Sequence, residues 1–150
     1  MCIENKLATL LDENWGKLLL RVSLGALMFF HGFKKYSVGI AGIKGLIIEA
    51  GFPAVLAYGV YMGEIIVPCL LILGLLTRVS ALIFSVTMAF AIYLVHAQAM
   101  FDVDAQTGGL VIELPLLYLL GALSLSFLGA GKYSLDAKMA QCKCSTKGSC

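Results

Sequence analysis

The candidates for chemistry in this chain are five ionisable side chains within its long apolar runs: Arg21, His31, Glu64, His96 and Glu113. Carboxylates and imidazoles can carry protons near neutral pH, and a guanidinium can balance the charge of a carboxylate. Because a charged group is costly in hydrocarbon, such residues usually face a protein interior or a water-filled cavity and mark a functional site. We therefore predict that Glu64, His31, His96 and Glu113 form a proton relay, with Arg21 as the charge partner.

The elements that position these groups are predicted from the apolar runs. Of the 150 residues, 60% are hydrophobic and 13% are charged, and this charged fraction is about half that of soluble domains. Four runs, at about residues 15–36, 54–76, 79–100 and 109–128, each approach the roughly 20 residues that a helix needs to cross a bilayer. Hydrocarbon offers backbone groups no water partner, so helices are expected. The prediction is an all-α integral membrane four-helix bundle.

The chain divides into an N-terminal segment at residues 1–14, the four-helix domain at 15–136 and a Cys-containing tail at 137–150 that we expect to be disordered. An even number of spans puts both termini on the same side of the membrane. Seven Lys and Arg residues lie on that side and three on the other, which favours cytoplasmic termini. The net charge is only +2 and no Lys/Arg-rich run occurs, so nucleic acid is not an expected partner.

The first outer loop, at about residues 37–53, is predicted to contain a short interfacial helix. Its apolar residues recur at helical spacing, namely Ile43, Leu46, Ile47 and Ala50. The sequence Gly51-Phe52-Pro53 would end this helix. The alternative is an irregular loop whose apolar residues have this spacing by chance.

The depth of each polar group follows from its place along its span. His31, His96 and Glu113 fall in one outer layer, and Glu64 falls near the middle of the bilayer below them. Glycines of the first span, such as Gly32, would let a neighbouring helix approach closely. Helical phase predicts which faces turn inward. These faces carry Ala57, Tyr61, Glu64 and Pro68 in the second span, Ser85, Ile92 and His96 in the third, and Glu113, Leu117, Leu120 and Ser124 in the fourth.

Each intramembrane group also has a simpler structural interpretation. Arg21 can extend its long stem to the cytoplasmic interface, or it can form a buried ion pair with Glu64. Glu113 lies near enough to the interface to be a solvated carboxylate. His31 and His96 are interfacial histidines, proton carriers or, together with one carboxylate, metal ligands. Two histidines and one carboxylate are a weak signal for a metal, and we predict no metal site.

The cysteines of the tail allow two interpretations. Cys142, Cys144 and Cys150 are cytoplasmic on the predicted topology, where a reducing environment disfavours disulfides. A disordered tail with free thiols is the preferred interpretation. Binding of a soft metal is the alternative, although the spacing of Cys142 and Cys144 is not that of a structural zinc site.

Several short motifs occur in a fixed order along residues 17–136. They are Arg21-Val-Ser-Leu-Gly25 with Phe30-His31-Gly32, then Gly51-Phe52-Pro53, Glu64, Leu73-Gly74-Leu75-Leu76-Thr77-Arg78, Val95-His96 and Gly129-Ala130-Gly131-Lys132-Tyr133-Ser134-Leu135-Asp136. In this order and with four spans, the chain resembles the DoxX family of small bacterial membrane proteins. The resemblance implies a multi-pass protein of the bacterial inner membrane. It also implies a link to membrane oxidoreductase complexes, either quinone-linked or serving thiol and oxidative-stress systems.

The predicted function is therefore a membrane subunit of an oxidoreductase system, an accessory subunit whose candidate cofactor is quinone. Its candidate partners, besides the lipid bilayer, are a soluble or membrane redox protein and further copies of the chain. The spans hold no pair of cysteines at active-disulfide spacing and only two histidines, so electrons would pass through quinone or a partner. The alternatives are a non-catalytic membrane anchor or assembly factor, and a small proton-coupled transporter, which with four spans would need a homo-oligomer.

Overall fold

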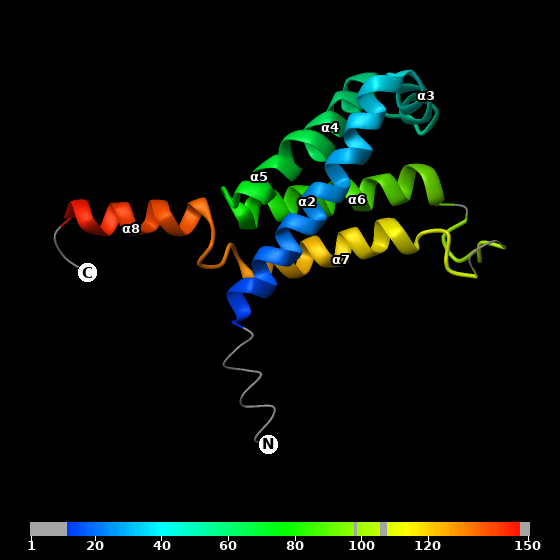
Figure 1. Ribbon diagram of the computed structural model, residues 1–150. Helices are drawn as coiled ribbons and strands as arrows, with labels where there is room; N and C mark the ends of the chain where they lie inside the picture. The colour runs from blue at the N-terminus through cyan, green and yellow to red at the C-terminus, as the bar shows by residue number, and fades with distance from the viewer. Residues whose placement is uncertain (1–11, 98, 106–107, 148–150) are drawn as a thin grey trace.

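The computed structural model describes residues 12–97, 99–105 and 108–147, and its apolar helices form one bundle (Figure 1). The elements of the bundle are α2 (Glu13–Val38), the composite of η1 (Ala54–Leu56), α4 (Ala57–Tyr61), η2 (Met62–Ile66) and α5 (Val67–Leu73), then α6 (Thr77–His96) and α7 (Glu113–Leu128). Within the described residues, α2, the composite helix and α6 are long and apolar enough to cross a membrane. The fourth, α7, is a shorter apolar helix of 16 residues.

The predicted all-α fold, with four helices consistent with a membrane bundle, is confirmed. The predicted and observed boundaries agree to within a few residues for the first three spans. The fourth helix begins later than predicted because the chain before it forms a bridged turn. Val103 and Leu110 pair as an isolated antiparallel bridge, and the N–H of Val111 donates to the carbonyl of Asp102 at 3.0 Å.

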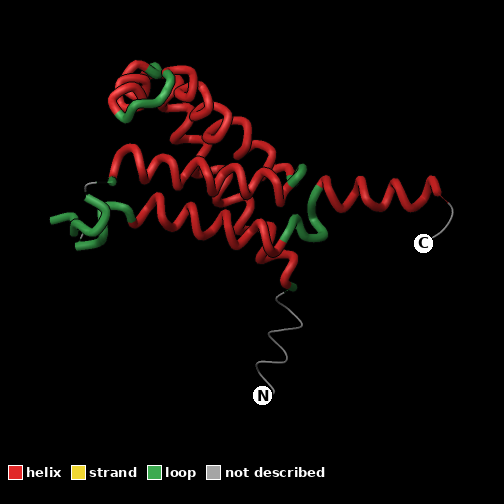
Figure 2. The backbone as a smooth tube through the Cα atoms, turned by 180° about the vertical axis from the view of Figure 1, so that it is seen from behind, coloured by secondary structure: helices red, strands yellow, loops and turns green. Residues whose placement is uncertain are grey.

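The helices pack in two crossing groups. Figure 1 shows α6 and α7 side by side, with α2 running obliquely across them, and α2 packs in turn against α5. Figure 2 shows the same arrangement from behind. The loop residues 99–105 and 108–112 lie with α3 (Ala41–Glu49) at one end of the bundle, which we call the loop end. The first turn of α2 and α8 (Leu135–Lys147) lie at the other, the terminal end.

The helix predicted in the first loop is present as α3. Ile47 fixes it to the bundle, since this side chain is fully buried while its neighbours on α3 are largely exposed. The helix ends as predicted, because Gly51 adopts a φ of +82°, a left-handed conformation that favours glycine. Phe52 then packs its ring against that of Phe90 on α6, with the centroids 5.6 Å apart.

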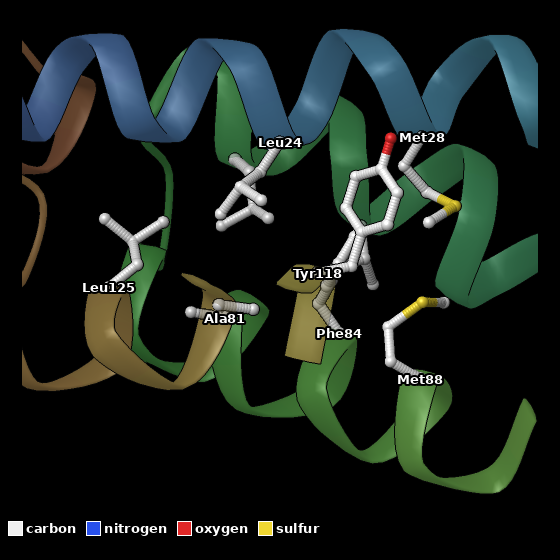
Figure 3. Packing of buried hydrophobic residues seen from close by; sticks show 10 residues of the cluster. Leu24, Met28, Ala81, Phe84, Met88, Tyr118 and Leu125 are labelled. Carbon is white, nitrogen blue, oxygen red and sulfur yellow. The ribbon is translucent and has the colours of Figure 1, made fainter. Parts of the chain in front are cut away.

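The core lies where α2, α5, α6 and α7 meet. Its buried side chains are Leu24, Met28, Val67, Leu71, Ala81, Phe84, Met88, Tyr118, Ala122 and Leu125 (Figure 3). Large apolar side chains are also exposed on the outer faces of the spanning helices, such as Phe30, Val86 and Phe127. In a membrane protein such residues face acyl chains and not water, so the exposed apolar surface is the expected lipid contact.

The predicted inward faces are correct for the second and third spans and wrong for the fourth. In the second span Ala57, Glu64 and Pro68 are buried, and in the third Ser85 and Ile92 are buried. In α7 the predicted face is exposed and the buried face is formed instead by Tyr118, Ala122, Leu125 and Ser126. The exposed residues are Glu113, Leu117, Leu120 and Ser124. Because α7 is apolar on all sides, its sequence has no periodicity that identifies the buried face.

The described part of the tail is helical. Residues 135–147 form α8, which Figures 1 and 2 show extending away from the bundle. Cys142 is exposed on this helix and Cys144 lies further along it. Cys150 and the N-terminal residues 1–11 lie outside the described residues.

Candidate functional site

Glu64 lies in a π-helical turn in the middle of the second span. The turn η2 is closed by a hydrogen bond from the N–H of Val67 to the carbonyl of Met62, one residue further back than in an α-helix. Pro68 follows, and its ring nitrogen has no hydrogen for the carbonyl of Glu64. The α-helical hydrogen bond is therefore missing at this position, which allows the wider turn. Such turns are often found at functional sites.

The first spanning helix touches this turn directly. A Cβ atom at Gly32 would overlap the carbonyl oxygen of Glu64, so the contact leaves no room for a side chain. The close approach predicted for the glycines of this span is thus confirmed at Gly32. Lys35 follows one helical turn further along α2, and the contact at Gly32 brings its ammonium to the Glu64 carboxylate.

Lys35 and Glu64 form an ion pair inside the bundle. The Nζ atom of Lys35 lies 2.5 Å from Oε1 of Glu64. The Glu64 side chain is 3% exposed and that of Lys35 is 41% exposed, so the pair joins a buried carboxylate to an ammonium that reaches the surface. The second oxygen of Glu64, Oε2, is buried and has no hydrogen-bond partner among the described residues. A carboxylate oxygen in this situation is an open acceptor site.

Two cavities meet at this pair. The first, which we call the apolar cavity, has a volume of about 270 Å³ and lies between the α3–α4 segment and α6. Its walls are mainly aliphatic and aromatic, with Leu56, Val60, Val86 and Phe90 among them. Both Lys35 and Glu64 line its polar end.

The second, the histidine cavity, has a volume of about 330 Å³ and is lined by the same ion pair together with His31 and His96. Tyr118 completes the wall, and its ring stands edge-on to that of His31 with the centroids 6.4 Å apart. Three of the predicted relay residues, Glu64, His31 and His96, therefore share one cavity.

Glu113 does not line either cavity. It is the first residue of α7 and its side chain is exposed, so the structure does not bring it to the other three. Sequence reasoning also missed two residues of the site, Lys35 and Tyr118. The spacing of His31 and Lys35, one helical turn apart, places both on the same helix face and could have identified Lys35. No sequence signal distinguishes Tyr118 from other aromatic residues of the apolar α7.

Arg21 does not form the ion pair with Glu64 that one of its two interpretations predicts, because the partner of Glu64 is Lys35. The side chain of Arg21 is buried, with the whole residue 2% exposed, and it lies away from the ion pair, at the terminal end. Nη1 donates to the carbonyl of Ala130 at 3.0 Å and Nη2 donates to the carbonyl of Tyr133 at 2.6 Å. The chain after α7 folds back across α2 and supplies these carbonyls to the two terminal nitrogens of the guanidinium, with no carboxylate in direct contact, while Nε is buried without a hydrogen-bond partner among the described residues. Arg21 is therefore a structural residue of the terminal end.

Asp136 belongs to the same group of hydrogen-bonded residues at the terminal end. Its carboxylate accepts hydrogen bonds from the N–H groups of Leu76 and Thr77, at 2.7 and 2.9 Å, and from the Thr77 hydroxyl at 2.9 Å. Partial burial opposes ionisation, but these hydrogen bonds and the nearby charge of Arg21 outweigh it and lower the pKa of Asp136 below its ordinary value. The carboxylate thus caps the start of α6, although Asp136 is distant from α6 in the sequence. The motifs around Arg21, Gly74 and Asp136 are parts of one cluster.

A metal site is not evident in the part of the chain that the structure describes. No group of three or more His, Cys, Asp or Glu side chains within the described ranges is placed to hold an ion. His31 and His96 share a cavity with one carboxylate whose partner is Lys35.

An ion pair with a buried carboxylate lies between two cavities, inside a bundle of four apolar helices, and this arrangement defines a small membrane protein with a polar interior. The chain belongs to the DoxX family, whose model matches residues 16–97. An uncharacterized protein of Haemophilus influenzae is 37% identical over 124 residues, which cover 79% of this chain and 87% of that protein. A Bacillus subtilis protein named "Putative oxidoreductase CatD" is 33% identical over 121 residues, 81% of this chain and 84% of that protein. No solved structure matches the chain.

Proposed function

We propose that this protein is a membrane subunit of an oxidoreductase system that is linked to quinone. In this proposal the Lys35–Glu64 pair binds the polar group of a lipid-soluble quinone, and the histidine cavity carries protons between the pair and the loop end. The observation that carries the proposal is the buried, unpartnered Oε2 of Glu64 at the meeting point of an apolar cavity and a histidine-lined cavity.

The chemistry of a quinone suits this arrangement, because its reduction takes up electrons and protons together. The apolar cavity offers a place for the ring that is reached from the lipid. Its volume of about 270 Å³ lies just below the usual range for ligand pockets, roughly 300–1,000 Å³, which suits a single ring with its chain extending outward. The Glu64 carboxylate accepts at Oε2 the proton that a reduced quinone releases, and Lys35 balances the charge of the carboxylate.

The proton route of the proposal runs through His31 and His96. Imidazole is the side chain best suited to exchange protons near neutral pH, and both rings line the cavity that contains the carboxylate. Glu113 is not included because it lines neither cavity. The relative named as an oxidoreductase supports a redox setting. The electrons would enter or leave through a redox partner protein.

The proposed location is the bacterial inner membrane, with both termini in the cytoplasm. The histidine cavity, near the loop end, would then exchange protons with the outer face. The anchor hypothesis accounts well for the hydrogen bonds of Arg21 and Asp136. It gives no reason for an open acceptor at Glu64, so we prefer the quinone-linked function.

The test is co-purification of quinone in mild detergent. Wild-type protein, Glu64→Gln and the control Glu49→Gln, an exposed residue of α3 that lines neither cavity, are purified from the same membranes, and extracted quinone is quantified per mole of protein. We expect quinone with wild type and control, and at least about a tenfold loss with Glu64→Gln. Extracts of folded wild-type protein that contain no quinone would contradict the proposal.

A further inference from the structure

The open oxygen of Glu64 also indicates which form of the ligand the site prefers. We infer that the apolar cavity binds its ligand in the reduced, hydroxyl-bearing form, with a phenolic O–H donating to Oε2 of Glu64. The inference rests on the proposed function and deepens it, because it names the redox state of the ligand that is bound most tightly.

The hydrogen-bonding capacity of the Lys35–Glu64 pair determines what Oε2 can bind. Lys35 donates to Oε1, and a carboxylate that faces an ammonium accepts hydrogen bonds but donates none. Oε2 is buried without a partner among the described residues, so it can be satisfied only by a donor. The carbonyl oxygen of an oxidised quinone is another acceptor, and placing it against Oε2 would bring two acceptors together. A phenolic hydroxyl supplies the missing donor.

The apolar cavity provides the route to this oxygen. Leu46, Leu56 and Val86, at the rim of the apolar cavity, are 41%, 42% and 68% exposed. Val86 and Leu56 lie on spanning elements, where exposed apolar residues face lipid. A molecule dissolved in the bilayer therefore meets an apolar entrance first and the carboxylate last. This order favours a ligand with an apolar body and one polar end.

The polar end of the apolar cavity suits a single small polar group of a ligand. Among the residues that line the apolar cavity, Lys35 and Glu64 are the charged ones. Thr87 has its hydroxyl hydrogen-bonded to the carbonyl of Ile83 at 2.9 Å, so that proton is already engaged within α6. None of the side chains that line this cavity donates to Oε2, and a hydroxyl-bearing ligand would supply the donor.

The test uses two probes that are not redox-active and differ only at the polar group: 4-heptylphenol and its methyl ether. Binding to wild-type protein, Glu64→Gln and Glu49→Gln is measured in detergent by calorimetric titration. We expect the phenol to bind wild type and the Glu49→Gln control at least about tenfold more tightly than the ether. In Glu64→Gln the amide offers a donor as well as an acceptor, so the preference should fall to about twofold or less.

The comparison within wild type decides the inference even where a variant does not fold. Equal affinity for the phenol and the ether in wild type would overturn it. Decylubiquinone and its reduced form, titrated without oxygen, separate this failure from failure of the proposed function. If the oxidised form binds more tightly and its binding depends on Glu64, the inference is wrong and the quinone-linked function stands. If neither form binds, the proposed function is wrong as well.

Discussion

The backbone of Gly32 lies against the carbonyl of Glu64, and this contact sets the position of the ion pair between Lys35 and Glu64. A Cβ on Gly32 would overlap the carbonyl oxygen of Glu64, so the two helices can be this close only with glycine. Pro68 leaves the same carbonyl without its α-helical donor. Two residues that carry no charge thus determine where the charged ones meet.

Replacing Gly32 with Ala should separate α2 from the π-turn and disturb the pair. The added methyl group meets backbone atoms that have no room to move, so we expect a loss of about 1–3 kcal/mol in stability. The measurement is thermal unfolding in detergent. Gly16→Ala is the matched control on the same helix, because nothing lies within 4 Å of a Cβ there. It should leave stability unchanged or raise it by up to about 1 kcal/mol through helix propensity. Equal effects of the two substitutions would argue against the close contact.

Lys35→Met should destabilise the protein by leaving the buried Glu64 carboxylate without its partner. We expect a cost of about 1–3 kcal/mol, below that of a fully buried pair because the Lys35 side chain is 41% exposed. Adding Glu64→Gln to Lys35→Met should restore part of the loss, since the unpaired charge is then gone. Unfolding of both single variants and the double variant in the same detergent gives the coupling energy, expected to be about 1 kcal/mol. Strictly additive effects would show that the pair contributes nothing.

The membrane bundle and the burial of Glu64 inside it could be predicted from the sequence because a charge within an apolar run is a strong and local signal. Lys35 was missed because it lies beside the predicted end of the first span, where a lysine is ordinary. The partners of Arg21 could not be predicted, since they are backbone carbonyls and a carbonyl has no sequence signature. The prediction of the buried face of α7 was wrong for a related reason. The one charged residue of this helix, Glu113, lies on the face predicted to turn inward, but it is at the helix start and is exposed.

The proposed topology predicts that both ends of the chain are cytoplasmic. A fluorescent protein fused after residue 150 should fold and fluoresce, because such fusions mature in the cytoplasm but not after export through the general secretion route. A cysteine placed at Ser37, an exposed residue near the loop end, should react in intact cells with a thiol reagent that cannot cross the inner membrane. The physical reason is the larger number of basic residues at the terminal side. A fusion that does not fluoresce, together with a Ser37→Cys variant that does not react, would show that the orientation is the opposite one.

Arg21→Lys should weaken the terminal end although it keeps the positive charge. The guanidinium uses two nitrogens to reach the carbonyls of Ala130 and Tyr133, and a lysine ammonium lacks this planar fork. We expect a loss of about 1–3 kcal/mol, with ligand binding at the Lys35–Glu64 pair retained in the folded fraction. Arg78→Lys is the control, since Arg78 makes one longer hydrogen bond, to the carbonyl of Ser126 at 3.2 Å. A larger effect at Arg78 than at Arg21 would contradict this assignment.

The cap formed by Asp136 should make the stability of the protein depend on pH in the acid range. The pKa of Asp136 is lowered in the folded state from 3.8, so the folded protein favours the carboxylate more than the unfolded chain does. The stability from this group is therefore complete above about pH 4 and is lost as the pH falls through the lower folded value.

Asp136→Asn keeps the shape of the side chain but weakens the bonds to Leu76 and Thr77, at a cost of about 1 kcal/mol near neutral pH. The difference between wild type and Asp136→Asn, measured by unfolding in detergent from pH 7 to pH 3, should be constant down to about pH 4 and shrink below it. Asp12, whose carboxylate accepts hydrogen bonds from Asn14 at the exposed start of α2, provides the comparison through Asp12→Asn. The effect of Asp12→Asn should be smaller, because Asp12 caps only its own helix. Asp136, in contrast, joins α8 to the start of α6. A difference at Asp136 that stays constant to pH 3 would mean that the carboxylate is not the group that holds these segments together.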